Sequence, residues 1–597
     1  MTAHPVAQAS PATDACNGSE RIAPDCRGLN FYAIDAALQG LLGLYLAGPL
    51  REHLEPHLQR MGELAGGRLD ELAEQADKHP PELRPRDRFG RDEAYIDYHP
   101  AYREMERIAF GEFGLHAMTH RGGVLGWPEP LPPMAKYAFQ YLFTQAEFGL
   151  MCPISVTDTS AHLVERFGDA ALRERLLPRM LAQDMEDLWK GAQFMTEKTG
   201  GSDVGGIETT ARRESDHWRV TGDKWFCSHA DGDVALLLAR PEGAPDGTRG
   251  LALFAMPWRL EDGRRNAYRI VRLKDKLGTR SMASGEIVLE GAVAYQVGEL
   301  NRGLKQMLEQ VNLSRLSHGV RAAGMMRRCL NESLQVARYR TAFGRRLIEL
   351  PLLRRQLLKL LVPTEQVLSL ALFTAHTMGA ANDGDSAAHA ALRILTPLLK
   401  FRACRDNIQV ATGAMEVRGG NGYIEDWVNA RLVRDAHLGV LWEGTSNINA
   451  LDVITRAVRK EGAHEPLAEG LYERLSAADG VPVAFRARVK AAAGRAVAFA
   501  AEVASKPDAE PLARQAASGL YHAASAALLT WEGARLGGAG GDARRLLLAR
   551  MVLAHRLEPH DPLAADGGTD WDGRAGALLL EDAPVPLEQA ARLVAEE

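Results

Sequence analysis

The chain has 597 residues, too many for one hydrophobic core, so its length predicts three or four domains. Hydrophobic residues make up 46% of the chain and charged residues 25%, as in soluble globular proteins, and the net charge of -6 favours neither nucleic acid nor a membrane as a partner of the whole chain. No apolar run approaches the roughly 18 residues of a membrane-spanning helix, so we expect no membrane partner.

Residues 1–29 predict a flexible tail rather than a targeting segment, because they have neither the basic start nor the apolar core of a secretory signal. The cysteines are scattered without a CxxC pair, and the histidines form no HExxH motif. We therefore expect reduced thiols, no metal site and a cytoplasmic location. The six cysteines are Cys16, Cys26, Cys152, Cys227, Cys329 and Cys404.

Residues 30–190 predict an N-terminal helical domain, since stretches such as LQGLLGLYLAGPL repeat apolar residues at helical spacing. The polar, proline-rich stretch HPPELRPRDRFGRDEAYIDYHP is expected to be a long connection between these helices. The pattern changes after residue 190. Residues 191–295 contain short β-prone runs, such as HWRVTGDKWFCS, divided by Gly, Asp and Pro, and predict a middle β-domain.

Helical periodicity returns in residues 296–460, which predict a bundle of long amphipathic helices. Residues 461–597 are rich in alanine and leucine and predict a separate, appended helical domain. Helices, then strands, then helices is an unusual order, and it indicates a β-domain inserted between two helical ones.

Two stretches of the β-domain have the composition of a cofactor site. QFMTEKTGGSDVGG (Gln193–Gly206) combines glycines and hydroxyls that let backbone amides approach a ring or a phosphate, although a flexible loop would explain it equally well. DKWFCS (Asp223–Ser228) places two aromatic residues beside a hydroxyl, which can lie against a flat heterocycle. Taken alone, it is more simply an ordinary core strand.

Two stretches of the bundle suggest phosphate or backbone contacts. In ARYRTAFGRR, Arg340 could bind a pyrophosphate and Phe343 could pack on an adenine, although a solvated helix end is the simpler alternative. In MEVRGGNGYIED, a helix C-cap explains one glycine but not three in four positions.

The stretch LWEGTSNINALDV places Glu443 just before a predicted helix that begins near Thr445 or the serine after it. A capping box needs its acid three residues after the cap, so Glu443 is not a member of one. Its neighbours Leu441 and Trp442 indicate an apolar setting, which raises the pKa of a carboxyl and suits a base that works near neutral pH. An acid that merely faces a helix N-terminus is the alternative.

These five stretches, in this order, resemble the acyl-CoA dehydrogenase flavoprotein family over residues 30–460. Lys198, where the family loop has proline, and Trp442, where most members have tyrosine, are similar to the AidB-like, alkylation-response branch. LNFYAIDAAL, CPISVTDTSA, KLGTRSMASGE and the appended domain are also similar to that branch. The matching motifs are MTEKTGGSDV with (V/M)TEPxxGSD, DKWFCS with K-x-W-I-(T/S), YRTAFGRRLIE with R-x-x-F-G-x-x-L, VRGGNGY with LGGxGY, and LWEGTSNI with YEGTxxI.

The resemblance implies a mainly α fold with an inserted β-domain: an N-terminal helical domain, a middle β-barrel or sandwich, a C-terminal four-helix bundle and an appended helical domain. It implies FAD between the β-domain and the bundle. Arg340 and Phe343 would reach a flavin bound mainly by a neighbouring subunit, which makes a homotetramer built from two dimers the expected assembly. The implied FAD-binding residues are Gln193, Met195, Thr196, Ser202, Phe226, Cys227, Ser228, Arg340, Phe343, Val417, Gly419, Gly420, Thr445 and Asn447.

The implied reaction is the α,β-desaturation of an acyl-CoA thioester in fatty acid metabolism, with an electron-transfer flavoprotein as the acceptor. Glu443 would be the catalytic base that takes the α-proton while the β-hydride leaves to flavin N5. Ser202, Arg315 and Gly444 would contact the substrate. Gly444 would let the backbone come close to the thioester.

The same branch leaves a second function open: a flavoprotein that binds and protects DNA in the alkylation response and has weak dehydrogenase activity. Residues 461–597 hold 14 Lys or Arg and 20 Asp or Glu, so their overall charge does not favour binding to phosphates. A local basic face that includes Arg535, Arg544, Arg545, Arg550 and Arg556 would be needed, although a solvated helix face is the simpler explanation of these residues. We therefore expect the enzyme rather than the DNA-binding protein.

Overall fold

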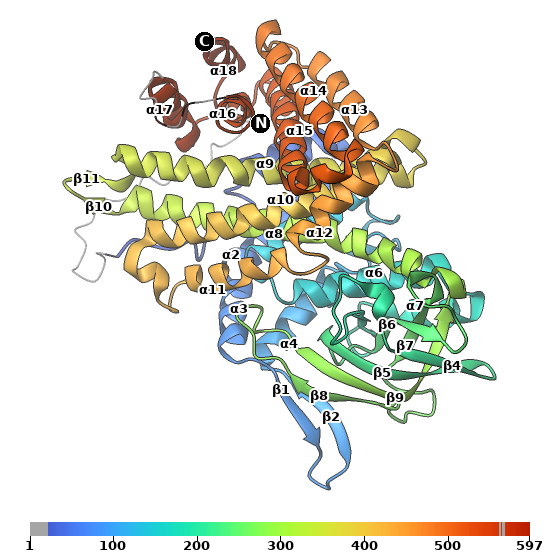
Figure 1. The fold of residues 1–597 in the computed structure, drawn as a ribbon. Helices are drawn as coiled ribbons and strands as arrows, with labels where there is room; N and C mark the ends of the chain where they lie inside the picture. The colour runs from blue at the N-terminus through green and yellow to red at the C-terminus, as the bar shows by residue number, and fades with distance from the viewer. Residues whose placement is uncertain (1–21, 560, 562, 564–567, 597) are drawn as a thin grey trace.

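The computed structural model describes residues 22–559, 561, 563 and 568–596. Most of the predicted tail, together with Cys16, lies outside the described residues. Within them, helices α1–α7 come first, then the β-domain, then the bundle and finally the appended helices (Figure 1). The fold has the predicted order.

The N-terminal part is helical, with one exception that the sequence did not predict. Two strands, β1 (Glu82–Arg86) and β2 (Asp92–Asp97), form an antiparallel hairpin within the stretch expected to be a connection, and the hairpin projects from the body (Figure 1). Ala94 and Ile96 are buried while Tyr95 and Asp97 are exposed, which is the alternation of a half-buried strand. The helices are α1 (Ala36–Tyr45), α2 (Gly48–Gly66), α3 (Arg68–Lys78), α4 (Pro100–Glu106), α5 (Pro133–Thr144), α6 (Met151–Phe167) and α7 (Ala170–Met180).

The β-domain is one seven-stranded sheet in the order β3-β5-β4-β6-β7-β9-β8. Additional β3–β6 and β5–β9 pairings curl the sheet back on itself like a barrel. Leu236 and Leu253 on the inner strands share a hydrophobic core with Leu163 of α6 and Leu176 of α7, which fixes the sheet against these helices. The strands are β3 (Gly191–Phe194), β4 (Thr210–Glu214), β5 (His217–Ser228), β6 (Val234–Pro241), β7 (Ala252–Pro257), β8 (Tyr268–Leu273) and β9 (Ser284–Val297).

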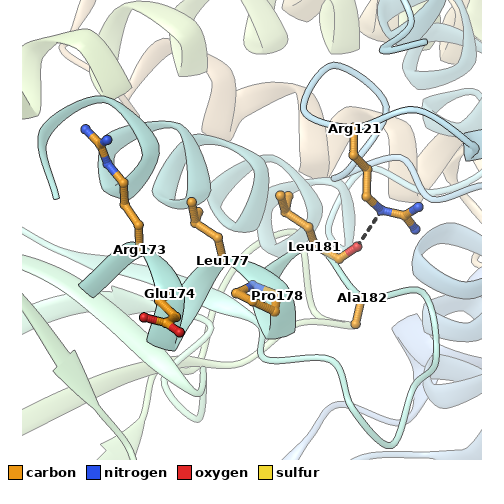
Figure 2. A pocket seen from close by; sticks show the side chains of 7 residues that line it. All are labelled: Arg121, Arg173, Glu174, Leu177, Pro178, Leu181 and Ala182. Atoms are coloured by element: carbon orange, nitrogen blue, oxygen red, sulfur yellow. Dashed lines mark hydrogen bonds between the residues drawn. The ribbon is translucent and has the colours of Figure 1, made fainter. Parts of the chain in front are cut away.

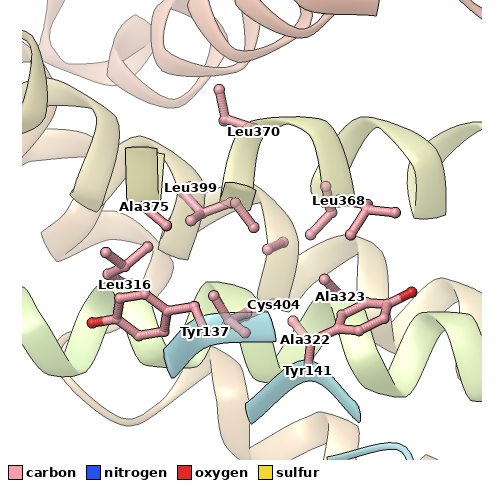
Figure 3. Close-up of a cluster of buried hydrophobic side chains, with 14 of the residues drawn as sticks. Tyr137, Tyr141, Leu316, Ala322, Ala323, Leu368, Leu370, Ala375, Leu399 and Cys404 are labelled. Atoms are coloured by element: carbon pink, nitrogen blue, oxygen red, sulfur yellow. The ribbon is translucent and has the colours of Figure 1, made fainter. Parts of the chain in front are cut away.

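The bundle is built on three long helices that pack side by side (Figure 1). Figure 3 shows their shared core, where Leu316, Leu368 and Leu399 meet two tyrosines of α5. Helix α9 contains a window long and apolar enough to cross a membrane, which the sequence analysis missed; 78% of that window is buried in the protein, as expected for a core helix. The helices are α8 (Gly303–Tyr339), α9 (Pro351–Asn382), α10 (Ser386–Arg418), α11 (Val428–Ala436) and α12 (Ser446–Leu451), and the short strands β10 (Thr341–Ala342) and β11 (Arg345–Arg346) join α8 to α9.

The appended helices pack on the bundle chiefly through α15, which contacts α9 and α10. Arg545 is 3% exposed and forms ion pairs with Glu365 of α9 (2.7 Å) and Glu532 of α15 (2.9 Å). Arg550 is also buried, so the basic face considered for this domain loses two of its five members. The helices are α13 (His464–Ser476), α14 (Val483–Ser505), α15 (Ala513–Gly538), α16 (Arg544–Val552), α17 (Gly568–Leu580) and α18 (Leu587–Ala595).

Candidate active site

A cavity of about 1060 Å³ lies between the β-domain and the bundle. It is large enough for a cofactor ring and a substrate chain together, since single-ligand pockets span about 300–1,000 Å³. Its walls come from α6, β3, β5, the segment 274–279, α8 and residues 437–456. The predicted site residues that line it are Gln193, Met195, Thr196, Ser202, Phe226, Ser228, Arg315, Glu443 and Gly444.

The backbone turns sharply where the predicted base lies. Glu443 has φ +52° and Gly444 has φ +90°, and α12 begins two residues later at Ser446. A glutamate with positive φ is strained by about 1–3 kcal/mol, which persists only where the surroundings impose it. A side chain at Gly444 would have its Cβ 2.9 Å from Cγ2 of Ile448, so the position also lacks room for one. The turn directs Glu443 into the cavity instead of along a helix.

The Glu443 carboxyl is held by α8. The Ser314 hydroxyl donates a hydrogen bond to Oε1 (3.0 Å), and Arg315 Nε donates to the Glu443 backbone carbonyl (3.2 Å). Removal from bulk water raises the pKa of Glu443 above its ordinary 4.5, while the Ser314 hydrogen bond and the nearby Arg315 charge oppose this rise. The result is a carboxyl whose pKa is moved towards neutral pH.

Three polar side chains fix the carbonyls around this turn. Arg315 forms an ion pair with Asp452 (2.6 Å), which also orients its Nε towards Glu443. Lys400 donates to the Gly444 carbonyl, and the Asn449 amide donates to the same oxygen (2.7 Å). Burial lowers the pKa of Lys400 to about 8. In this chain Arg315 therefore positions the base, whatever contact it also makes with a ligand in the cavity.

The opposite wall has the groups that a flavin ring requires. Gln193 on β3, Thr196 after it and Ser228 at the end of β5 present an amide and two hydroxyls to the cavity. Phe226 is 56% exposed, an unusual exposure for a phenylalanine on a strand. A Cβ on Gly201 would lie 2.6 Å from the Thr196 hydroxyl, so the loop folds tightly here only because glycine is present. These groups fit a flat ring with polar edges.

Cys227, between Phe226 and Ser228, does not take part. It is fully buried, pairs with Gly285 of β9 and lies outside the cavity lining. Side chains alternate between the two faces of a strand, so a cavity that receives residues 226 and 228 excludes residue 227. The Cys227 side chain therefore lies away from the cavity that Phe226 and Ser228 line, and its predicted contact with the cofactor stays a prediction.

A second group of predicted FAD residues lies far from this cavity. Arg340 follows Ser314 by about 39 Å along α8, at 1.5 Å per residue. Phe343 is 92% exposed at the tip of the β10–β11 hairpin, and Gly419 lies next to Arg340, since a Cβ there would be 3.5 Å from Arg340 Nη1. Within one chain these residues cannot reach the same cavity as Glu443. The remaining members of this group are Val417 and Gly420.

Two more predicted contacts, Thr445 and Asn447, are exposed and do not line the cavity. They lie on the outer side of the turn that carries Glu443. Their assignment to the cofactor, like that of the hairpin residues, would require a neighbouring subunit.

Sequence reasoning missed several cavity residues. Arg321, two turns after Ser314 on α8, faces the cavity together with Cys152 of α6 and Lys276. Two features of the sequence could have identified them. The spacing of Ser314 and Arg321 places both on one helix face, and Cys152 begins the CPISVTDTSA stretch. Burial lowers the pKa of Lys276 to about 8 and raises that of Cys152.

A second, shallow groove lies on α7, beside Leu177 and Leu181 (Figure 2). Arg121 Nε donates to the Leu181 carbonyl (2.9 Å), and Arg173 and Glu174 lie at its side. The groove contains no buried acid or base comparable to Glu443, so it is a poor candidate for chemistry.

Comparisons with known protein families agree with this geometry. Residues 22–187 match the N-terminal domain of the adaptive response protein AidB. Residues 192–292 match the acyl-CoA dehydrogenase middle domain, and residues 301–458 match the acyl-CoA dehydrogenase C-terminal domain. The cavity lies where the middle and C-terminal domains meet.

Individual relatives cover most of the chain. AidB of Escherichia coli strain K12 is 33% identical over 456 residues, which span 74% of this chain and 81% of AidB. Acyl-CoA dehydrogenase family member 11 of Caenorhabditis elegans is 32% identical over 411 residues, 66% of each chain. The crystal structure of Caenorhabditis elegans ACDH-11 in complex with C11-CoA matches with a TM-score of 0.83 and 26% identity, covering 92% of this chain and 95% of that one.

Proposed function

We propose, from the premise that this chain belongs to the acyl-CoA dehydrogenase family and has an AidB-type N-terminal domain, that it is an FAD-dependent enzyme that desaturates an acyl-CoA thioester between its α and β carbons. One observation carries the proposal: a carboxyl of raised pKa, Glu443, lines the same cavity as the polar and aromatic groups that suit a flavin ring. The relative crystallised with C11-CoA supports a thioester as the ligand.

Glu443 is the base in this proposal. An α-proton next to a thioester is weakly acidic, so its removal requires a base of matched pKa at a fixed position and stabilisation of the charge that develops. Ser314 and Arg315 hold Glu443 on one side of the acyl chain, and the left-handed turn at Gly444 brings backbone close to the thioester. Bound FAD would supply the acceptor for the hydride that leaves the β-carbon.

Gln193, Thr196 and Ser228 would hold the polar edge of the ring, and Phe226 would lie against it. Arg340 and Phe343 would reach the flavin of a neighbouring subunit, since they lie about 39 Å along α8 from Ser314 in their own chain. We propose a homo-oligomer for this reason, and an electron-transfer flavoprotein as the acceptor of the electrons by family resemblance.

DNA binding in the alkylation response receives less support. Of the five arginines considered for a basic face on the appended domain, Arg545 and Arg550 are buried, and Arg544 forms a hydrogen-bonded ion pair with Asp542. A surface that binds duplex DNA needs several free cations to neutralise phosphates. We therefore propose the dehydrogenase as the main function.

Titration of the flavin spectrum separates these functions. The purified holoprotein is mixed without oxygen with acyl-CoAs of several lengths, and separately with duplex DNA at low and moderate salt. We expect one thioester to bleach the oxidised flavin band. Salt-sensitive DNA binding without bleaching by any thioester would contradict the proposal and favour the DNA-binding function.

A further inference from the structure

Arg321 is a buried cation with too few partners. It is 1% exposed, and its Nε donates to the Ser317 hydroxyl (3.1 Å). Its Nη1 has no hydrogen-bond partner, and the guanidinium forms no ion pair with a carboxylate in the described parts of the chain. Arginine remains charged even when buried, because its pKa lies far above neutral pH.

Other buried arginines of α8 form ion pairs with carboxylates, which Arg321 lacks among the described residues. Arg327 pairs with Asp35 (3.2 Å) and Glu365, and Arg328 pairs with Asp70 (3.1 Å) and Glu332 (2.9 Å). This helix therefore buries arginines with acids beside them, but Arg321 is an exception. An unpaired charge removed from water costs several kcal/mol, so its retention at a cavity wall indicates a ligand that supplies the opposite charge.

The surroundings of Arg321 place that ligand in the active-site cavity. Arg321 lines the same cavity as Glu443, beside the Cys152 thiol, and its guanidinium carbon lies 6.0 Å from the centre of the Phe148 ring. Lys276, which is half-buried and also lines the cavity, donates among the described residues only to the Met282 carbonyl and the Ser284 hydroxyl. Arg321 and Lys276 therefore give this side of the cavity two cations that form no ion pair with an acid among the described residues.

We propose that Arg321 binds a carboxylate on the acyl chain, so that the preferred substrates are CoA thioesters of dicarboxylic acids. This inference rests on the proposed function. A carboxylate can accept two parallel hydrogen bonds from a guanidinium, and Nη1 is free to donate one of them. A chain that ends in a methyl group would leave the buried charge unpaired.

The alternative is that Arg321 serves only as a counter-charge to Glu443, whose pKa it helps to lower. Such a role would affect every thioester alike, because every substrate loses its α-proton to the same base. The ratio between a dicarboxylic and a monocarboxylic thioester of equal length therefore distinguishes the two roles, whereas a rate alone does not.

The test measures binding by calorimetry to flavin-loaded Glu443→Gln protein, in which turnover is blocked, with adipyl-CoA against hexanoyl-CoA and suberyl-CoA against octanoyl-CoA. We expect at least one dicarboxylic thioester to bind about tenfold to a hundredfold more tightly than its partner. Adding Arg321→Gln should remove this preference, and Arg321→Lys should retain part of it. Lys305→Gln, which removes an exposed charge on the same helix outside the cavity, should leave the preference unchanged.

Equal or tighter binding of both monocarboxylic thioesters would overturn the inference, as would a preference that persists in Arg321→Gln. Even if the Arg321 variants do not fold, the binding of dicarboxylic against monocarboxylic thioesters to the Glu443→Gln protein, in which Arg321 is intact, tests the inference. In native protein, bleaching by hexanoyl-CoA without any preference for adipyl-CoA would leave the proposed function standing and remove only the inference. Absence of binding and bleaching with all four thioesters would remove both.

Discussion

At Glu443, opposing influences set the state of the carboxyl. Burial in the cavity raises its pKa, while the hydrogen bond from Ser314 and the charges of Arg315, Lys400 and Arg321 lower it. A base must be deprotonated to act, so the reaction is expected to lose rate as the pH falls through the pKa of Glu443. Because that pKa is raised, the loss begins at a higher pH than it would for a carboxyl in water.

Ser314→Ala tests this balance. The variant loses a donor that favours the charged carboxylate, so the pKa of Glu443 rises further and the acidic limb of the pH profile of kcat/KM moves to higher pH. Activity should be reduced most at low pH and recover towards neutral and alkaline pH. An unchanged limb would show that Ser314 does not act on the base.

Ser333→Ala is the matched control for this measurement. Ser333 is also buried on α8 but donates to the Cys329 carbonyl, away from the cavity. Its removal should leave the position of the acidic limb unchanged.

The sequence predicted residues whose roles depend on local motifs and missed those that depend on packing. Glu443, Thr196 and Ser228 follow motifs, and all three line the cavity. Arg321 has no motif, because its significance is that no carboxylate among the described residues forms an ion pair with it in three dimensions. Cys227 lies outside the cavity because the pairing of β5 with β9 decides which side chains of β5 face the cavity, and the sequence motif does not show this pairing.

Among the elements, α9, α15 and α16 are joined by a buried ionic network. Arg545 of α16 contacts Glu365 of α9, Glu532 of α15 and the Ser369 hydroxyl (2.7 Å). Glu365 also pairs with Arg327 of α8, so the network reaches the bundle core. It fixes the appended helices on the bundle at one orientation.

Arg545→Met tests the network. The change leaves two buried carboxylates with one fewer cation, which we expect to cost about 3–5 kcal/mol in the free energy of unfolding. Urea unfolding followed by circular dichroism measures this loss as a first transition at a lower urea concentration. Arg574→Met, which removes a half-exposed surface ion pair with Glu596, should cost at most about 1 kcal/mol. Equal effects of the two changes would contradict the assignment.

Helical periodicity located the long helices well, because each has an apolar stripe that must be buried. The β1–β2 hairpin escaped detection because prolines and charges surround it and only Ala94 and Ile96 mark its buried face. The apolar window of α9 was overlooked as well, since scattered polar residues interrupt it. A sequence window long enough to reveal a long helix averages over the few residues that mark a short strand.

In the whole molecule, most of the candidate cofactor residues fall into two separate groups. One lines the cavity between the β-domain and the bundle, and the other lies at the β10–β11 hairpin at the far end of α8 (Figure 1). The resemblance had already implied that Arg340 and Phe343 reach a flavin bound mainly by a neighbouring subunit, and their distance from the cavity within one chain is consistent with that expectation. A flavin bound between two copies of the chain would unite them.

Phe343→Ala tests this arrangement. If the hairpin packs on the flavin of a neighbouring subunit, the variant should release FAD on gel filtration while the native protein retains it, and the loss should grow on dilution. The absorbance ratio of flavin to protein measures retention. Phe89→Ala, at the tip of the β1–β2 hairpin and 68% exposed, provides a matched control and should retain FAD. Full retention by Phe343→Ala would contradict a shared site.

The central claim is that Glu443 removes the α-proton of a thioester held in this cavity. Rapid mixing of the holoprotein with the thioester that bleaches it best gives the rate of flavin reduction for native protein, for Glu443→Gln, and for Glu416→Gln as an exposed acid on α10. We predict that Glu443→Gln keeps its FAD but is reduced about a thousandfold more slowly, with Glu416→Gln unaffected. Reduction of Glu443→Gln at the native rate would contradict the account.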